Sequence, residues 1–121
     1  VMDFDFDEGV LRTEVTFHPM HSGAPGRVHG GVLAGVLDEF AGAILRLADT
    51  RGATGRLTIN YRSPIPMGIP LAFRGWVDHR EGRKVVVRGE VHRGDELIAD
   101  MEGLMVVIDY AAIDTSGNAR H

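Results

Sequence analysis

The sequence contains no cysteine, which excludes disulfide bonds, thiolate nucleophiles and thiolate metal sites. Lysine is nearly absent as well: Lys84 is one of thirteen basic residues and the other twelve are arginines, which can grip phosphate through two parallel hydrogen bonds. No apolar run approaches the roughly 20 residues needed to cross a bilayer, and no secretory signal pattern opens the chain. We therefore expect a cytoplasmic protein.

Positive charge is also in short supply, since the formal net charge is -4. This balance argues against broad nucleic-acid binding, which needs a basic face, although thirteen cations can still gather around an anionic small molecule. The 121 residues are 44% hydrophobic and 25% charged, as in an ordinary globular domain with one core. We expect a single domain over residues 1–121, with 110–121 as a frayed tail.

Hydrophobic periodicity predicts strands on both sides of one helix. Before the helix, alternating apolar residues and a turn at Glu8-Gly9 predict a two-stranded start, followed by a loop rich in Gly, Pro, His and Ser. After residue 52, tight turns separate a series of strands, the first of them ended by Pro64 and Pro66. The predicted elements are strands over 1–7 and 10–18, a loop over 19–31, a helix over 32–45, and strands over 56–62, 71–79, 84–92 and 97–109.

The predicted helix carries only two charges, Asp38 and Glu39, and a helix that is apolar nearly all round is typically buried. Helical spacing places small residues on the face of Asp38, namely Ala34, Gly35, Ala41 and Gly42. A single apolar helix needs a sheet curled around it. The pattern therefore predicts an α+β domain in which an antiparallel sheet wraps around one long central helix.

A buried carboxylate is costly unless it is paired, hydrogen-bonded or neutralised, so Asp38 requires an explanation. One interpretation is structural: the carboxylate caps a neighbouring loop or pairs with an arginine. The other is functional: Asp38 is a general base or nucleophile with a raised pKa. Glu39 is the weaker candidate, because its position one residue further on turns it towards solvent or an arginine.

The sequence His29-Gly30-Gly31 stands where the predicted helix begins. Amides at a helix start attract negative charge and can hold the oxyanion of a tetrahedral intermediate, although glycines there also serve close packing. Gly30 and Asp38 are eight residues apart, about 12 Å along one helix, whereas groups that serve one carbonyl lie within about 3 Å of its reacting atoms. If both groups act, two chains related by a two-fold axis must supply them.

Three segments resemble the hotdog-fold acyl-CoA thioesterases, in the branch of the phenylacetate-pathway thioesterases and the thioesterase-superfamily proteins of animals. They are residues 25–31 with Asp38 nine residues after His29, residues 60–66 (Asn-Tyr-Arg-Ser-Pro-Ile-Pro), and residues 81–84 (Glu-Gly-Arg-Lys). The resemblance covers residues 22–109. It implies a hotdog fold, a homodimer joined edge to edge that often pairs into a homotetramer, and hydrolysis of acyl-CoA without a cofactor or metal.

The same resemblance implies roles for individual residues. Asp38 would activate water or attack the thioester carbonyl directly, and Thr54 would help to place the water. The amide of Gly30, together with that of Gly31, would polarise the carbonyl. His29 would hold either the loop or the substrate.

Two further sets of residues belong to the implied substrate site. Many relatives carry Asn or Gln a few residues before His-Gly-Gly, where this chain has Ser22, which either substitutes or leaves the role unfilled. Coenzyme A carries several negative charges, so its phosphates should meet basic groups at the mouth of the site. The candidates are Arg62, Arg83 and Lys84.

Two other functions remain open at this point. A 3-hydroxyacyl thioester dehydratase or hydratase of the same fold pairs a histidine with a carboxylate; His18, His21 or His29 would then pair with Asp38 or Glu39. A non-enzymatic acyl-CoA-binding module is the second alternative. The six histidines do not show the spacing of a metal-ligand set.

Overall fold

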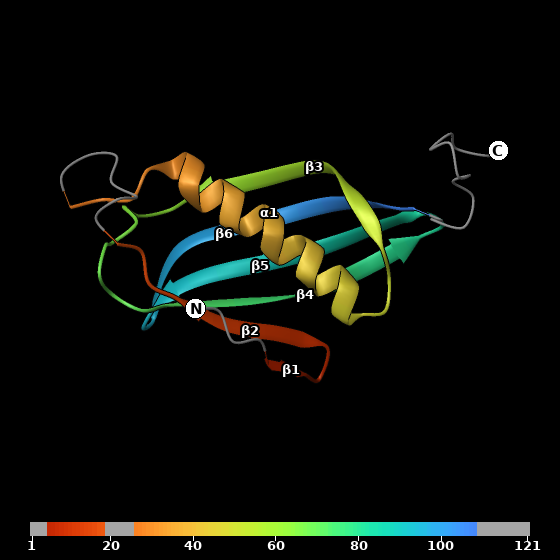
Figure 1. Cartoon of the computed structure of the whole chain (residues 1–121), viewed down its shortest axis with the longest axis horizontal. Helices are drawn as coiled ribbons and strands as arrows, with labels where there is room; N and C mark the ends of the chain where they lie inside the picture. Colours follow the sequence, from red (N-terminus) through yellow and green to blue (C-terminus); the bar gives the residue numbers. More distant parts are fainter. Residues whose placement is uncertain (1–4, 19–25, 109–121) are drawn as a thin grey trace.

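A computed structural model of the chain describes residues 5–18 and 26–108. In these residues, one antiparallel sheet lies across a long helix, α1, with the strand order β1-β2-β4-β5-β6-β3 (Figure 1). Strands β1 and β3 therefore form the two edges. The bounds are β1 Asp5–Asp7, β2 Val10–Val15, α1 Gly30–Leu47, β3 Gly52–Tyr61, β4 Leu71–Glu81, β5 Lys84–Arg93 and β6 Glu96–Val107.

Short turns rich in glycine join the neighbouring strands, as the sequence predicts. Glu8 and Gly9 both have positive φ (54° and 75°), which suits the tight two-residue connection between β1 and β2. Gly82 between β4 and β5 and Gly94 between β5 and β6 also have positive φ, at 60° and 58°. The predicted tail at 110–121 lies outside the described residues.

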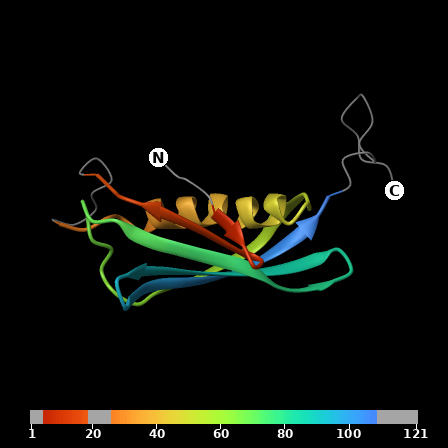
Figure 2. The same ribbon diagram turned by 90° about the horizontal axis from the view of Figure 1, so that it is seen from below.

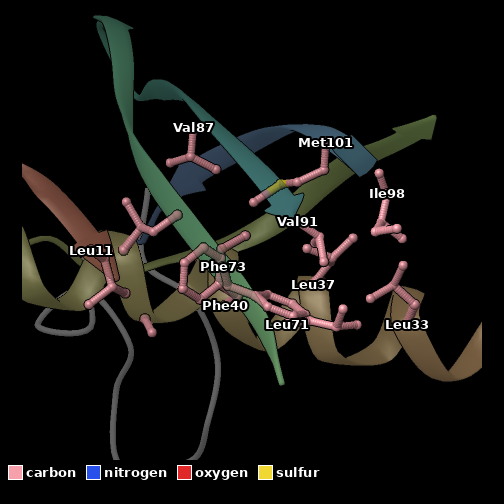
Figure 3. Close-up of a cluster of buried hydrophobic side chains, with 14 of the residues drawn as sticks. Leu11, Leu33, Leu37, Phe40, Leu71, Phe73, Val87, Val91, Ile98 and Met101 are labelled. Carbon is pink, nitrogen blue, oxygen red and sulfur yellow. The ribbon is translucent and has the colours of Figure 1, made fainter. Parts of the chain in front are cut away.

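The hydrophobic core lies between α1 and the sheet (Figure 3). Leu33, Leu37 and Phe40 of the helix point towards the strands, and the rings of Phe40 and Phe73 meet edge-on with centroids 5.7 Å apart. Burying each such side chain contributes roughly 1.5–3 kcal/mol. This packing fixes which side of the helix faces the sheet.

Gly75 in β4 allows the helix to approach the sheet closely. A Cβ atom at this position would lie 2.5 Å from Cδ1 of Ile44 and 2.7 Å from Cε2 of Phe40. Both of those side chains belong to α1, so any larger residue would push the helix away from β4. Among the described residues, no helix is long and apolar enough to cross a membrane.

The helix differs from the prediction in two ways. It runs from Gly30 to Leu47, two residues beyond the prediction at each end, and His29 caps its start. It is also not buried all round: the sheet covers only one side (Figure 2), so Asp38 and Glu39 are exposed within the single chain. Ala41 is fully buried against the sheet, so placing it on the face of Asp38 was wrong.

Candidate functional site

Asp38 lies on the side of α1 that the sheet leaves uncovered, and Thr54 in β3 reaches it. The hydroxyl Oγ1 of Thr54 donates a hydrogen bond to Oδ1 of Asp38 over 2.7 Å. Within the part of the chain that the structure describes, Oδ2 of Asp38 has no hydrogen-bond partner. The bond therefore orients the carboxylate and leaves one oxygen available to a substrate or water.

A β-bulge in the edge strand explains how Thr54 comes to face the helix. The pairing of β3 with β6 shifts between Thr54 and Arg56, which leaves Gly55 as an extra residue. Side chains alternate along a regular strand, so Thr54 and Leu57 would otherwise point to opposite faces. With the bulge, both face α1, opposite Met105 and Gly103 of β6.

The peptide that joins Gly30 to Gly31 is held at both ends. Its N–H donates to Nδ1 of His29 over 2.9 Å, and its carbonyl accepts a hydrogen bond from the Tyr61 hydroxyl over 2.7 Å. The preceding N–H, that of Gly30, makes no hydrogen bond with any described residue. The helix start thus presents the free Gly30 amide on a backbone held by two hydrogen bonds. The Gly31 amide is not free, because it donates to His29.

The three cations considered for the coenzyme A phosphates lie at two separate places. Arg62, just after β3, forms an ion pair with Asp100 at 2.8 Å. Arg83 and Lys84 lie at the turn between β4 and β5, where the Arg83 guanidinium donates to the Val107 carbonyl over 3.1 Å. Val107 pairs with the opposite end of β3, roughly 30 Å of strand away from Arg62. Ser22 lies outside the described residues.

Two hollows open along the uncovered side of the helix. One, of about 350 Å³, adjoins the helix start and is lined in part by Arg27, Gly30 and Tyr61. The other, of about 210 Å³, is lined by Gly42, Arg46, Arg51 and Gly52. Tyr61, Arg46 and Arg51 were not among the predicted site residues. Helical spacing offered a signal for Arg46 alone, because positions 38, 42 and 46 are four residues apart and form a stripe along the helix.

The outer face of the sheet, away from α1, carries arginines that form ion pairs with glutamates. Arg74 pairs with Glu90 at 2.6 Å, and Arg88 pairs with Glu102 at 2.9 Å. Burial alone would raise the pKa of Glu90, but its hydrogen bonds to Arg74 and His92 outweigh burial and lower that pKa below its ordinary value. Charge on this face is therefore largely neutralised by internal pairing.

Two further observations concern the alternatives. Nδ1 of His29 is occupied at the helix cap and Oδ1 of Asp38 accepts a hydrogen bond from Thr54, so neither of these two atoms is available to a histidine–carboxylate pair. Over residues 5–18 and 26–108, no three His, Asp or Glu side chains gather in an arrangement that could hold a metal ion.

Comparison with known proteins places this geometry in a family. A family model described as the thioesterase superfamily matches residues 25–99. Acyl-coenzyme A thioesterase THEM4 of Xenopus laevis is 31% identical over 90 residues, which cover 74% of this chain and 40% of that protein. The chain thus spans about 40% of the length of this curated relative.

Solved structures agree with the observed fold. A crystal structure of a thioesterase superfamily protein matches with a TM-score of 0.83 and 32% identity, covering 87% of this chain and 55% of that one. The protein smu.793 from Streptococcus mutans, solved bound to acetyl CoA, matches with a TM-score of 0.82 and 20% identity over 100% of this chain and 92% of its own. The predicted hotdog fold is confirmed, and the chain belongs to the thioesterase superfamily.

Proposed function

We propose that the chain hydrolyses acyl-CoA thioesters to a free acid and CoA. The observation that carries this proposal is the hydrogen bond from Thr54 to Asp38 on an uncovered helix face, because it presents an oriented carboxylate to a substrate. The name of the THEM4 relative indicates the same activity, and the acetyl CoA bound to the Streptococcus mutans protein indicates the same ligand class.

The carbonyl-polarising amide comes from a second copy of the chain. Gly30 and Asp38 lie on one continuous helix, so about 12 Å of helix axis separates them. Strand β3 is a sheet edge of ten residues without proline, and such an edge is a template for pairing with another strand. Two β3 strands paired about a two-fold axis would bring the uncovered helix faces together and set Gly30 of one chain against Asp38 of the other. Two such dimers can pair further into a tetramer.

The chemistry follows from this arrangement. Asp38, oriented by Thr54, accepts a proton through its free Oδ2 from a water molecule, and the water oxygen bonds to the thioester carbon. The carbonyl oxygen becomes an oxyanion that accepts a hydrogen bond from the Gly30 N–H of the other chain. The carbon–sulfur bond then breaks, and protonated Asp38 returns the proton to the departing thiolate. The products are the carboxylic acid and CoA.

Direct attack by Asp38 is the alternative route through the same groups. The carboxylate forms a mixed anhydride with the acyl group as the carbon–sulfur bond breaks, and the departing thiolate takes a proton from water. The hydroxide left by that water then hydrolyses the anhydride to the acid and the free carboxylate. In a single turnover in water labelled with oxygen-18, label in the Asp38 side chain identifies an anhydride hydrolysed at the enzyme carbonyl, which the general-base route does not produce.

For the CoA phosphates we retain Arg62, Arg83 and Lys84 as candidates. Arg83 and Lys84 flank a turn, and their exposure suits contact with a nucleotide outside the catalytic cleft. The Michaelis constant of Arg83→Ala tests this role. An increase of about fivefold or more would support a phosphate contact, whereas an unchanged constant would remove Arg83 from the set.

The decisive experiment measures thiol release from short, medium, long and aromatic acyl-CoAs with wild type and Asp38→Asn. The substitution keeps the size of the side chain and removes its charge, so we expect a loss of about a hundredfold or more in kcat on the preferred substrate. Glu39→Gln is the matched control, because Glu39 is the adjacent exposed carboxylate and makes no side-chain hydrogen bond or ion pair with a described residue.

Two results would contradict the proposal. One is wild type that releases no thiol from any member of the panel; the other is Asp38→Asn that works as well as wild type. Incubation of the same preparation with crotonyl-CoA tests the dehydratase function, and the loss of the double bond measures the hydration. Hydration without thiol release would assign the chain to that reaction.

A further inference from the structure

The hollow lined by Gly42, Arg46, Arg51 and Gly52 begins one helical turn beyond Asp38, the proposed catalytic residue. Arg46 folds back along the helix: its Nη1 lies 3.1 Å from the position that a Cβ atom would take on Gly42. The guanidinium therefore lies over Gly42, which is one helical turn from Asp38. This turn corresponds to about 6 Å along the helix axis. A positive group thus lies about one helical turn from Asp38, the proposed catalytic residue.

These two arginines differ from those on the outer face of the sheet. Among the described residues, neither Arg46 nor Arg51 has a side-chain hydrogen bond or an ion pair, and both are exposed. A larger hollow of about 480 Å³ shares both arginines with the hollow at Gly42, and its lining adds one carboxylate, that of Asp49. The side chains of the two hollows therefore carry two positive charges and one negative charge.

The proposed dimer makes these free charges significant. With Gly30 of the second chain against Asp38, the Arg46 guanidinium over Gly42 would lie one helical turn from the enclosed reacting groups, at the border of the site. A hydrocarbon chain lying in the hollow would cover the guanidinium without satisfying its donors, which is costly. A carboxylate would accept two parallel hydrogen bonds from the same group.

We propose that this hollow binds an anionic end of the acyl group, so that the preferred substrates are short acyl-CoAs with a terminal carboxylate. The inference rests on the proposed function and names the substrate class of that site. The spacing of one helical turn suits a five- or six-carbon dicarboxylic acyl chain, by the roughly 6 Å axial distance above. The phosphates of CoA are the other anionic source, but the pantetheine arm that separates them from sulfur is much longer than one helical turn.

Arg46 also has a structural explanation, which the test must separate from binding. It lies in the last turn of α1, where a cation stabilises the helix dipole. Loss of that contribution would alter folding and lower the activity on all substrates alike. A binding role instead changes the ratio between charged and neutral substrates of the same length.

The experiment compares kcat/KM for pentanoyl-CoA with glutaryl-CoA and for hexanoyl-CoA with adipoyl-CoA. Wild type, Arg46→Met and Arg46→Lys are measured, with Arg12→Met as the control, because Arg12 is an equally exposed arginine on β2, far from β3 in the sheet order. We expect wild type and the control to prefer the carboxylated substrates by about tenfold or more. Arg46→Met should lose that preference and keep its rate on the neutral substrates, and Arg46→Lys should keep part of it.

The outcomes separate this inference from the proposed function. If wild type hydrolyses the carboxylated and the neutral acyl-CoAs at equal rates, the inference is wrong and the proposed acyl-CoA hydrolysis stands. If wild type releases no thiol from any substrate, the inference and the proposed function are both wrong. A further pair of measurements uses acyl-pantetheines, which lack the phosphates. If Arg46→Met slows every acyl-CoA equally but spares the acyl-pantetheines, the arginine binds CoA phosphate and the inference is wrong.

Discussion

The Tyr61 hydroxyl lies 2.7 Å from the carbonyl oxygen of Gly30, so the last residue of the edge strand holds the first residue of the helix. The ring also limits what position 30 can carry, since a Cβ atom there would lie 3.3 Å from Cζ of Tyr61. Tyr61 is 49% exposed, which is unusual for a side chain that fixes a helix start. Its role in the proposed reaction is to position the free Gly30 amide.

Replacing Tyr61 with phenylalanine tests this positioning role. Tyr61→Phe removes one hydrogen bond from an exposed site, so the free energy of unfolding should fall by about 1 kcal/mol or less. The Gly30 amide would be less firmly held towards the oxyanion, and we expect kcat to fall by about tenfold while KM changes little. Steady-state kinetics on the best acyl-CoA and thermal unfolding give the two readouts.

Asn60→Ala is the matched control for this change. Asn60 precedes Tyr61, faces the other side of the sheet and also makes one hydrogen bond of 2.7 Å, to Asp100. Its loss should leave kcat unchanged. If Tyr61→Phe behaves like Asn60→Ala in both measurements, the clamp at the helix start does not serve catalysis.

Thr54→Val removes the hydrogen bond to Asp38 and preserves the shape of the side chain. The carboxylate would then lose its fixed orientation, and we expect kcat to fall by roughly ten- to a hundredfold. Thr54→Ser keeps the hydroxyl and should retain most of the rate. Thr58→Val is the control, because Thr58 is an exposed threonine on the opposite face of the same strand. Equal kcat values for the two valine variants would rule out a role for the hydroxyl.

Much of the fold could be predicted from residue patterns, because each strand alternates and each turn carries a glycine. The exposure of the helix face that carries Asp38 could not be predicted in this way. Uncovered helix faces usually carry charged residues, but here Gly31, Gly35 and Gly42 occupy the uncovered side together with Asp38. Low polarity therefore suggested burial, although within one chain nothing described covers that face.

The site could be predicted only where spacing along the chain carried the information. Thr54 was implied only by the family resemblance, because its pairing with Asp38 depends on a bulge at Gly55 that changes the face of one strand residue. The cap by His29 depends on a side-chain rotamer in the same way. Arg46 was missed because its position in the last helical turn suggests only a favourable interaction with the helix dipole.

Acid should destabilise the protein partly through Glu90. Its folded pKa is lowered below the ordinary value near 4.5, mainly by Arg74 and His92 acting against burial. A lowered pKa contributes stability above the unfolded value, and this stability is lost as the pH falls through the folded value. For this partly exposed pair the contribution is roughly 1 kcal/mol or less after allowing for solvent screening.

The expected measurement is a melting temperature that falls between about pH 5 and pH 3. Glu90→Gln should lower the melting temperature at neutral pH and make the acid decline shallower. Glu14→Gln is the control, since Glu14 is an exposed glutamate on β2 without a described ion pair. A Glu90→Gln curve parallel to wild type would show that this carboxylate does not contribute to the decline.

A mixed dimer tests whether one active site draws on two chains. Asp38→Asn removes the carboxylate, and Gly30→Pro removes the free amide. Proline is favoured at a first helical position, and the extended backbone of His29 (φ -63°, ψ 135°) suits the residue before a proline. The added Cβ atom would lie 3.3 Å from Cζ of Tyr61, whose exposed ring can shift by the few tenths of an ångström required. Each variant alone should form an inactive dimer.

The two variant chains are co-expressed, each with its own affinity tag, and the mixed dimer is purified through both tags. The two hypotheses predict different substitutions at its two sites. If Asp38 of one chain acts with Gly30 of the other, one site carries both substitutions and the second site carries neither. The mixed dimer should then show about half the wild-type rate per dimer. If each chain contained a complete site, both sites would carry one substitution and the mixed dimer would be as inactive as its parents. Purification through both tags also shows that Gly30→Pro still folds and assembles, so an inactive mixed dimer would count directly against shared sites.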